Sequence, residues 1–144
     1  MKITCSLTTL LGRLCLSAIF LMAGIGKIMH YDQTAKYMES KGMTMIPFFL
    51  VAALLIELIG ALSLIIGFKT RWGAALLLLF LIPTTLIFHD FWNVDEASRQ
   101  MQMINFLKNL GIFGGLLYVL SCGAGRFSVD SCCCRSECNY DRCE

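Results

Sequence analysis

The chain has 144 residues, of which 57% are hydrophobic and 15% are charged, whereas soluble globular domains carry roughly 25% charged residues. A net charge of +2 is too small and too scattered along the chain to favour nucleic-acid binding. The length allows one modest domain, and the composition is that of an integral membrane protein in a lipid bilayer.

Four apolar runs are each long enough to cross a bilayer, which requires about 20 residues. They cover residues 10–29, 46–68, 72–92 and 103–122. Helices are the expected form, because a helix satisfies its own backbone hydrogen bonds in lipid. The sequence therefore predicts an all-α, integral membrane four-helix bundle with short loops over residues 1–130. A Cys-rich C-terminal tail, expected to be disordered, follows over residues 131–144.

The first run has an alternative interpretation as a cleaved signal peptide, with Lys2 as its basic start. Two features argue against cleavage. Arg13 interrupts the apolar stretch, and the MAGIGK that follows is a poor small-residue cleavage site. We therefore expect this helix to remain in the protein.

A shorter helix is predicted between the first and second runs. The stretch YDQTAKYMESKG places Tyr31, Ala35 and Met38 at helical spacing. Gly42 is the expected end of this helix, because glycine readily adopts the left-handed conformation that terminates helices. The segment is predicted to lie at the membrane interface.

The second run, IPFFLVAALLIELIGALSLIIGF, carries a single charge, Glu57. Glu57 lies about 16 Å from the start of the run, near the midplane of an apolar core about 30 Å thick. A charge at this depth costs about 2.5–3.5 kcal/mol on insertion scales. We therefore expect Glu57 to face the bundle interior with a partner or a proton. Lys108 is the expected partner by depth, and Arg13 is the second choice.

The third run contains Pro83, which should bend its helix. The neighbouring hydroxyl groups of Thr84 and Thr85 are expected to help satisfy the backbone there. Trp72 and Trp92, at the two ends of this run, are interpreted as interfacial anchors.

Most polar side chains within the runs fall in one half of the predicted bundle, the outer half. Ionisable residues inside a membrane are candidates for a functional site. A buried Glu–Lys pair that only fixes helix packing would give the same pattern, and a histidine at a helix end is often no ligand. The candidate intramembrane polar site consists of Glu57, Lys108, Asn109, Arg13, His89 and Lys27.

The distribution of Lys and Arg favours an arrangement with both termini in the cytoplasm, because cations collect on that side. Seven cations then lie inside and five outside. The short turn that carries Lys69 and Arg71 is the stronger indication.

Five segments of the chain read, in order, LGRLCLSAIFLMAGIGKI, IELIGALSLIIGFKTRWGAALL, FHDFW, FLKNLGIFGGLLY and GAGRFSVD. Together they resemble the DoxX family of small bacterial membrane proteins, over most of the chain. The resemblance implies a multi-pass protein of the bacterial inner membrane. The family is similar to the DoxD membrane subunit of a thiosulfate:quinone oxidoreductase, and other members are linked to complexes that handle thiol and oxidative stress. Carried over by position, the family's polar pattern falls on Arg13, Lys27, Glu57, Arg71, His89, Lys108, Asn109 and Asp130.

The sequence carries no haem, flavin or dinucleotide motif. A quinone needs only an apolar groove with a few polar groups, for which His89, Asn109 and Lys108 are candidates. Two functions stay open. In the first, the protein is the membrane subunit of an oxidoreductase or thiol-stress system, with a quinone or small-molecule site in the outer half and a soluble oxidoreductase or a second copy as partner. In the second, it is a non-enzymatic anchor or a carrier of small solutes or protons, in which Glu57 handles a proton or stabilises packing.

Five of the eight cysteines lie in the tail SCCCRSECNYDRCE. Their spacing is not that of a zinc finger or ribbon. Cytoplasmic thiols stay reduced, so three interpretations remain: a thiol tail without a specific role, metal capture or redox sensing, and structural disulfides. Cys5, Cys15 and Cys122 are interpreted as apolar filler in or beside the spans. The candidate metal ligands are Cys132, Cys133, Cys134, Cys138 and Cys143.

Overall fold

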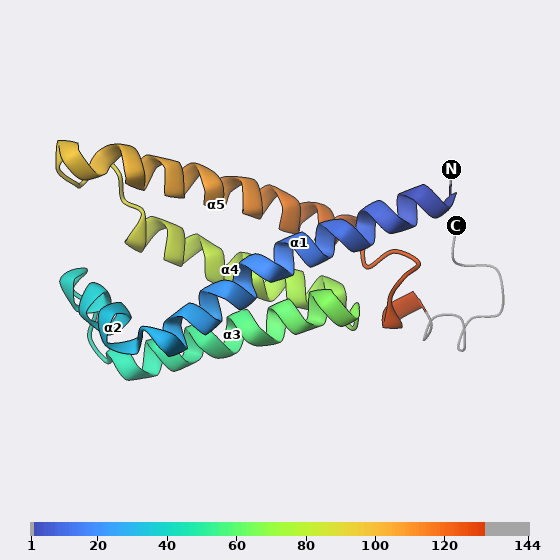
Figure 1. Cartoon of the computed structure of the whole chain (residues 1–144), viewed down its shortest axis with the longest axis horizontal. Helices are drawn as coiled ribbons and strands as arrows, with labels where there is room; N and C mark the ends of the chain where they lie inside the picture. The colour runs from blue at the N-terminus through green and yellow to red at the C-terminus, as the bar shows by residue number, and fades with distance from the viewer. Residues whose placement is uncertain (1, 132–144) are drawn as a thin grey trace.

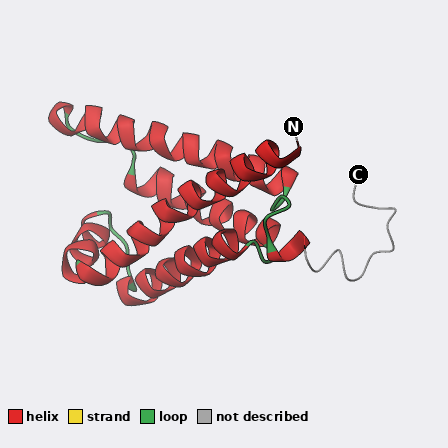
Figure 2. Ribbon diagram, turned by 45° about the vertical axis from the view of Figure 1, so that its right-hand side comes forward, coloured by secondary structure: helices red, strands yellow, loops and turns green. Residues whose placement is uncertain are grey.

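The computed structural model describes residues 2–131, which form five helices joined by short connections. Figure 2 shows only helices and loops in this part of the chain. Four of the helices are long and apolar enough to cross a membrane, which confirms the predicted all-α four-helix membrane bundle. The short second helix matches the segment predicted to lie at the interface. The helices, labelled in Figure 1, are α1 (Lys2–Met29), α2 (Tyr31–Ser40), α3 (Ile46–Ile66), α4 (Thr70–Phe88) and α5 (Glu96–Cys122).

The boundaries of α4 and α5 differ from the predicted runs. Apolar residues continue past Phe88, but α4 ends there, and Phe91 and Trp92 lie in the connection to α5. Their rings pack edge-to-face on each other and on Phe106 of α5. The predicted run extended to Trp92 because it was drawn from hydrophobicity. These residues are apolar because they pack in the aromatic cluster, and not because they belong to the helix. Helix α5 begins at Glu96, before its apolar stretch, since a polar turn can be helical outside the lipid.

The long helices pack in the order α1, α3, α4, α5. Helix α1 lies against α3, α3 against α4, and α4 against α5. In Figure 1, α5 meets α1 near one end of the bundle and diverges from it toward the other. At the meeting point, a Cβ added to Gly115 would lie 3.1 Å from Leu16 of α1. We call the end that holds α2 the α2 end, and the other the opposite end.

Small residues bring α3 and α4 close together. A Cβ added to Gly60 would lie 2.5 Å from Leu77, and one added to Gly73 would lie 2.3 Å from Ser63. Each helix therefore packs a side chain against bare backbone of the other, as is common between helices in membranes. The core is made of Phe20, Ala61, Leu64, Ala74, Leu77, Leu78, Leu81, Ile112, Leu116 and Val119.

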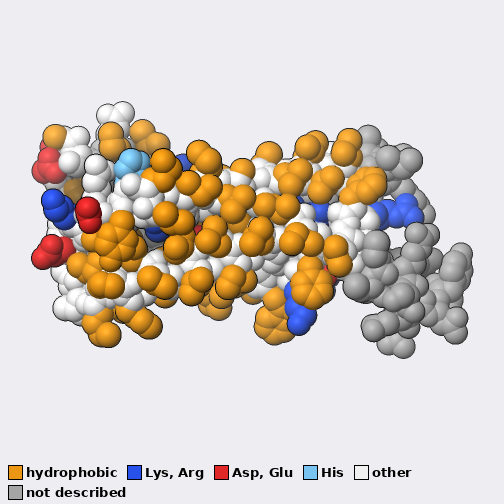
Figure 3. All heavy atoms as spheres, turned by 60° about the horizontal axis from the view of Figure 1, so that its bottom comes forward, with side chains coloured by type: hydrophobic (Ala, Val, Ile, Leu, Met, Phe, Trp, Pro, Cys, Tyr) orange, Lys and Arg blue, Asp and Glu red, His pale blue; other side chains and the backbone are white. Residues whose placement is uncertain are grey.

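The outer surface of the bundle is apolar along its length. Figure 3 shows hydrophobic side chains over the middle of the molecule and acidic side chains gathered at the α2 end. Many large side chains are more than half exposed, including Met22, Ile59, Leu79 and Leu110. Such a surface is unfavourable in water and suits contact with lipid.

Pro83 lies inside α4, as predicted. It has no N–H to donate to the preceding turn. The carbonyl left without this donor is that of Leu79, and the Thr84 hydroxyl donates to the next carbonyl, that of Phe80, at 2.8 Å. Thr85 has a different role, because its hydroxyl oxygen accepts a hydrogen bond from Asn109 of α5.

Candidate functional site

An ion pair joins α1 to α3 toward the α2 end. Lys27 Nζ lies 2.7 Å from Glu57 Oε1 and 2.8 Å from Oε2. Glu57 is 3% exposed, so its carboxylate is removed from lipid and water. Gly24, one turn before Lys27, faces α3, where a Cβ would lie in ordinary contact with Leu54 and Leu58 at 3.4 Å. The predicted inward orientation of Glu57 is confirmed.

The expected coupling of Glu57 to Lys108 or Arg13 is wrong. Lys108 is exposed on α5, and its ammonium group donates to Asn105 Oδ1 on the same helix, at 3.1 Å. Lys108 was predicted as the partner from its depth in the membrane. Helix α5, however, packs on α4 and not on α3, which carries Glu57. Arg13 lies about 21 Å from Lys27 along α1, at about 1.5 Å per residue.

Arg13 lies at the opposite end and is fully buried. Its Nη2 donates to the carbonyl of Phe127, at 2.6 Å, in the segment that follows α5. Its Nη1 lies against Gly67, where a Cβ would come within 2.3 Å. Gly67 ends α3 with a φ of 72°, a conformation that glycine adopts without strain. Arg13 therefore holds the C-terminal segment against the α3–α4 turn.

Asp130 completes this arrangement. Its carboxylate accepts hydrogen bonds from the backbone N–H groups of Lys69, at 2.7 Å, and Thr70, at 3.0 Å. Burial raises the pKa of Asp130, but the backbone N–H groups of Thr70 and Lys69, with the charge of Arg13, outweigh it and hold the pKa below its ordinary value. Asp130 thus caps the first turn of α4 from a distant part of the chain.

The remaining candidates make separate contacts. Asn109 donates to Thr85 at 3.0 Å, which ties α5 to α4. His89 Nδ1 lies 3.0 Å from Gln102 Oε1, at the α2 end of the same two helices. Of the candidate residues, the structure brings only Lys27 and Glu57 into contact.

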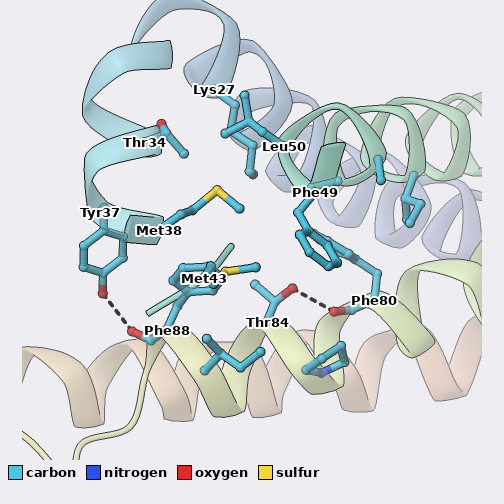
Figure 4. Close-up of a pocket in the computed structure, with 15 residues that line it drawn as sticks. Lys27, Thr34, Tyr37, Met38, Met43, Phe49, Leu50, Phe80, Thr84 and Phe88 are labelled. Carbon is cyan, nitrogen blue, oxygen red and sulfur yellow. Dashed lines mark hydrogen bonds between the residues drawn. The ribbon is translucent and has the colours of Figure 1, made fainter. Parts of the chain in front are cut away.

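A cavity lies next to the ion pair, between α2, α3 and α4 (Figure 4). Its volume is about 390 Å³, and its wall includes Met38 from α2, Leu50 from α3 and Phe80 from α4. Among the described residues that line it, Lys27 is the one with a charged side chain. The cavity is therefore apolar, with a single cation at its edge.

The hydroxyl groups in the cavity wall already form hydrogen bonds with backbone carbonyl groups. Tyr37 donates to the carbonyl of Phe88 at 2.9 Å, as Figure 4 shows. Thr34 donates to the carbonyl of His30 at 3.0 Å. These bonds leave few free donors facing the apolar space.

Helix α2 forms the roof of the cavity and is fixed to α4 at its far end. Lys41 forms an ion pair with Asp90, just after α4. The hydrogen bond from Lys41 lowers the pKa of Asp90 below its ordinary value. Together with the bond from Tyr37 to Phe88, this pair holds α2 over the space between α3 and α4.

Sequence reasoning missed the cavity. The helical spacing in the stretch after α1 pointed to Met38, which is buried under α2. The adjacent small residues Ala52 and Ala53 on α3 leave room beside it, but small residues also occur where helices touch. The sequence does not show whether such small residues line a cavity or lie at a contact between helices.

The proposed metal ligands of the tail, Cys132 to Cys143, lie outside the described residues. Within residues 2–131, no three His, Cys, Asp or Glu side chains are grouped as a metal site would require. Cys15 and Cys122 are exposed and form no disulfide bond within the described residues.

Comparison with known proteins places the chain in a family. The family model described as DoxX matches residues 8–90, more than half of the chain. The chain belongs to the DoxX family. The matched part of this DoxX protein contains Lys27, Glu57 and every residue that lines the cavity.

Similar proteins cover most of the chain. It is 33% identical over 121 residues to the inner membrane protein YphA of Escherichia coli (strain K12), covering 84% of this chain and 86% of that one. It is 36% identical over 121 residues to YqjF of the same strain, covering 84% and 88%. A stretch of 68 residues is 43% identical to the Surfeit locus protein 4 homolog of Schizosaccharomyces pombe, covering 46% of this chain and 22% of that protein. No solved structure matches the chain at a significant level.

Proposed function

We propose that this DoxX protein is the membrane subunit of an oxidoreductase or thiol-stress system. Its cavity under α2 binds a small hydrophobic molecule, and quinones are the leading class. The observation that carries the proposal is the apolar cavity of about 390 Å³ with Lys27 at its edge. Ligand pockets in proteins are typically about 300–1,000 Å³, apolar, and supplied with a few polar groups.

The walls fit a quinone better than a polar solute. Met38, Leu50 and Phe80 offer apolar contact for a ring or an isoprenoid chain. The Lys27 ammonium uses two N–H groups on Glu57, and its third faces the Ala23 carbonyl at 3.5 Å, so this third N–H is the one that would turn to a ligand carbonyl oxygen at the edge of the cavity. His89, Asn109 and Lys108, which the sequence suggested for this purpose, do not line it.

The cavity also has a route to lipid. Phe49 of α3 and Ile87 of α4 line it and are 44% and 40% exposed on the apolar surface of the bundle. A hydrophobic molecule dissolved in the bilayer could therefore enter sideways between α3 and α4, without crossing water.

The second candidate function is a non-enzymatic anchor or a carrier of small solutes or protons. The ion pair favours this function. Lys27 donates to both oxygens of Glu57 and faces the carbonyl of Ala23 at 3.5 Å, so the pair can hold the helices together without any ligand. Quinone-dependent activity with a co-purifying soluble partner would support the first function. Transport into proteoliposomes without a redox partner would support the second.

The cavity is tested by filling it. Binding of a short-chain quinone is measured by equilibrium titration of the purified protein in lipid nanodiscs. Ala53→Phe should weaken binding by about tenfold or more, because a bulky ring would occupy a space that ligand and side chain cannot share. Ala18→Phe, on the exposed side of α1, is the matched control and should bind as the unaltered protein does. No saturable binding, or equal binding by both variants, would overturn the proposal.

We further propose that the protein lies in the inner membrane with both termini in the cytoplasm, so that the α2 end faces outward. The names of the E. coli relatives support the membrane, and the cation distribution supports the orientation. A reporter fused after Glu144 should read as cytoplasmic, and one inserted near Ser98 as external. A C-terminal reporter that reads as external would contradict this orientation.

A further inference from the structure

A second hollow adjoins the cavity at the corner between α1 and α2. It is an open recess whose lining shares Lys27, Thr34 and Tyr37 with the cavity and adds His30 and Gln33. The two hollows therefore meet at Lys27. The cavity is partly open and almost entirely apolar, whereas the recess is more open and has a larger polar share in its lining.

The recess offers hydrogen-bond donors that are free. Within the described part of the chain, neither the His30 ring nor the Gln33 amide has a hydrogen-bond partner, and both residues are exposed. Each has an N–H group to donate, and the Lys27 ammonium lies between them and the cavity. Among the described residues that line either hollow, none is Asp or Glu.

The charge at this junction is already balanced. Glu57 contacts Lys27 through both carboxylate oxygens, so the pair presents little net charge to the recess. An anionic head group placed at Lys27 would also be repelled by Glu57. An uncharged acceptor can take the N–H groups of His30 and Gln33 without disturbing the pair.

We infer that the site takes an uncharged amphiphile that joins a hydrogen-bond-accepting head to an apolar chain, as a quinone does; this inference rests on the function proposed above. The head lies in the recess against His30, Gln33 and Lys27. The apolar chain fills the cavity beneath Met38 and leaves toward lipid past Phe49. The junction thus selects against free acids as well as against hydrocarbons without a head.

A matched series of ligands tests the head-group preference. A medium-chain fatty acid, its methyl ester and the alkane of the same length compete with a short-chain quinone for the protein in nanodiscs, at a pH where the acid is ionised. The ester should compete better than either the acid or the alkane. The double variant His30→Phe, Gln33→Leu should weaken quinone and ester by about tenfold, since two hydrogen bonds are lost, and leave the alkane unchanged. Gln100→Leu, an exposed change on α5, is the control and should alter none of them.

Two results would overturn the inference. One is tighter binding of the acid than of its ester. The other is an equal loss of quinone and alkane binding in the double variant, which would indicate a general disturbance of α2. Failure of the head site is distinguishable from failure of the cavity. If the ligands bind more weakly to Ala53→Phe but equally well to the His30→Phe, Gln33→Leu variant, the cavity is supported as the binding site and the head site is contradicted. If none of the ligands binds, the proposed function falls too.

Discussion

At the scale of single residues, the buried carboxylate of Glu57 depends on one partner for its charge. It lies in the middle of an apolar helix and is compensated by Lys27 alone among the described cations. Taking both charges out of water is expensive, so such a pair adds little net stability compared with apolar residues of the same shape. Removing one partner is different, because the other charge is left buried and uncompensated.

We predict that Lys27→Met destabilises the bundle by about 3–5 kcal/mol, since it strands Glu57. Glu57→Gln should cost less, because it removes the buried charge and keeps the shape, and the double variant should recover part of the loss. The measurement is the free energy of unfolding in mixed micelles. Lys108→Met is the control, and it should have little effect because Lys108 is exposed on α5. Strict additivity of the Lys27 and Glu57 changes would show that the two residues do not interact.

At the scale of elements, the start of α4 depends on a residue about sixty positions later. Lys69, the N-cap residue of α4, has a φ of 48° and makes no capping bond with its side chain. Asp130 supplies that bond, and its own backbone N–H donates to the carbonyl of Gly67, at 2.8 Å. The segment after α5 is therefore part of the bundle.

We predict that Asp130→Ala lowers the free energy of unfolding by about 0.5–2 kcal/mol, the usual effect of losing an N-cap. Asp95→Ala is the matched control, because Asp95 occupies the N-cap of α5 without a side-chain bond and should matter less. An equal effect of the two substitutions would contradict a specific role for Asp130.

The same contact has a pH dependence. The pKa of Asp130 is lower in the folded protein than its ordinary value, so the unfolded chain takes up this proton first as pH falls. Its stabilisation is therefore complete above pH of about 4 and is lost as pH falls from there through the lowered pKa. The difference in stability between the unaltered protein and Asp130→Asn should shrink over that interval.

At the scale of the whole molecule, the spans could be predicted because length and hydrophobicity are properties of each segment. The partner of Glu57 could not, because it depends on which helices are neighbours. Lys108 has a suitable depth, but α5 leans away from α1 at the α2 end and leaves Lys27 as the near cation (Figure 1). The cavity depends on the same packing, since α2 must lie across α3 and α4 to enclose it.

The most direct test of the account is to map where a quinone binds. A photoreactive short-chain quinone is irradiated with the protein in nanodiscs, and the labelled peptides are identified by mass spectrometry. We predict labels in the stretch from Lys27 to Leu50, which includes the head site and the cavity wall, and in the part of α4 between Phe80 and Phe88, and their loss in Ala53→Phe. Labels confined to the smaller groove between α4 and α5, of about 180 Å³ and lined by Phe106 and Leu110, would contradict a ligand site under α2.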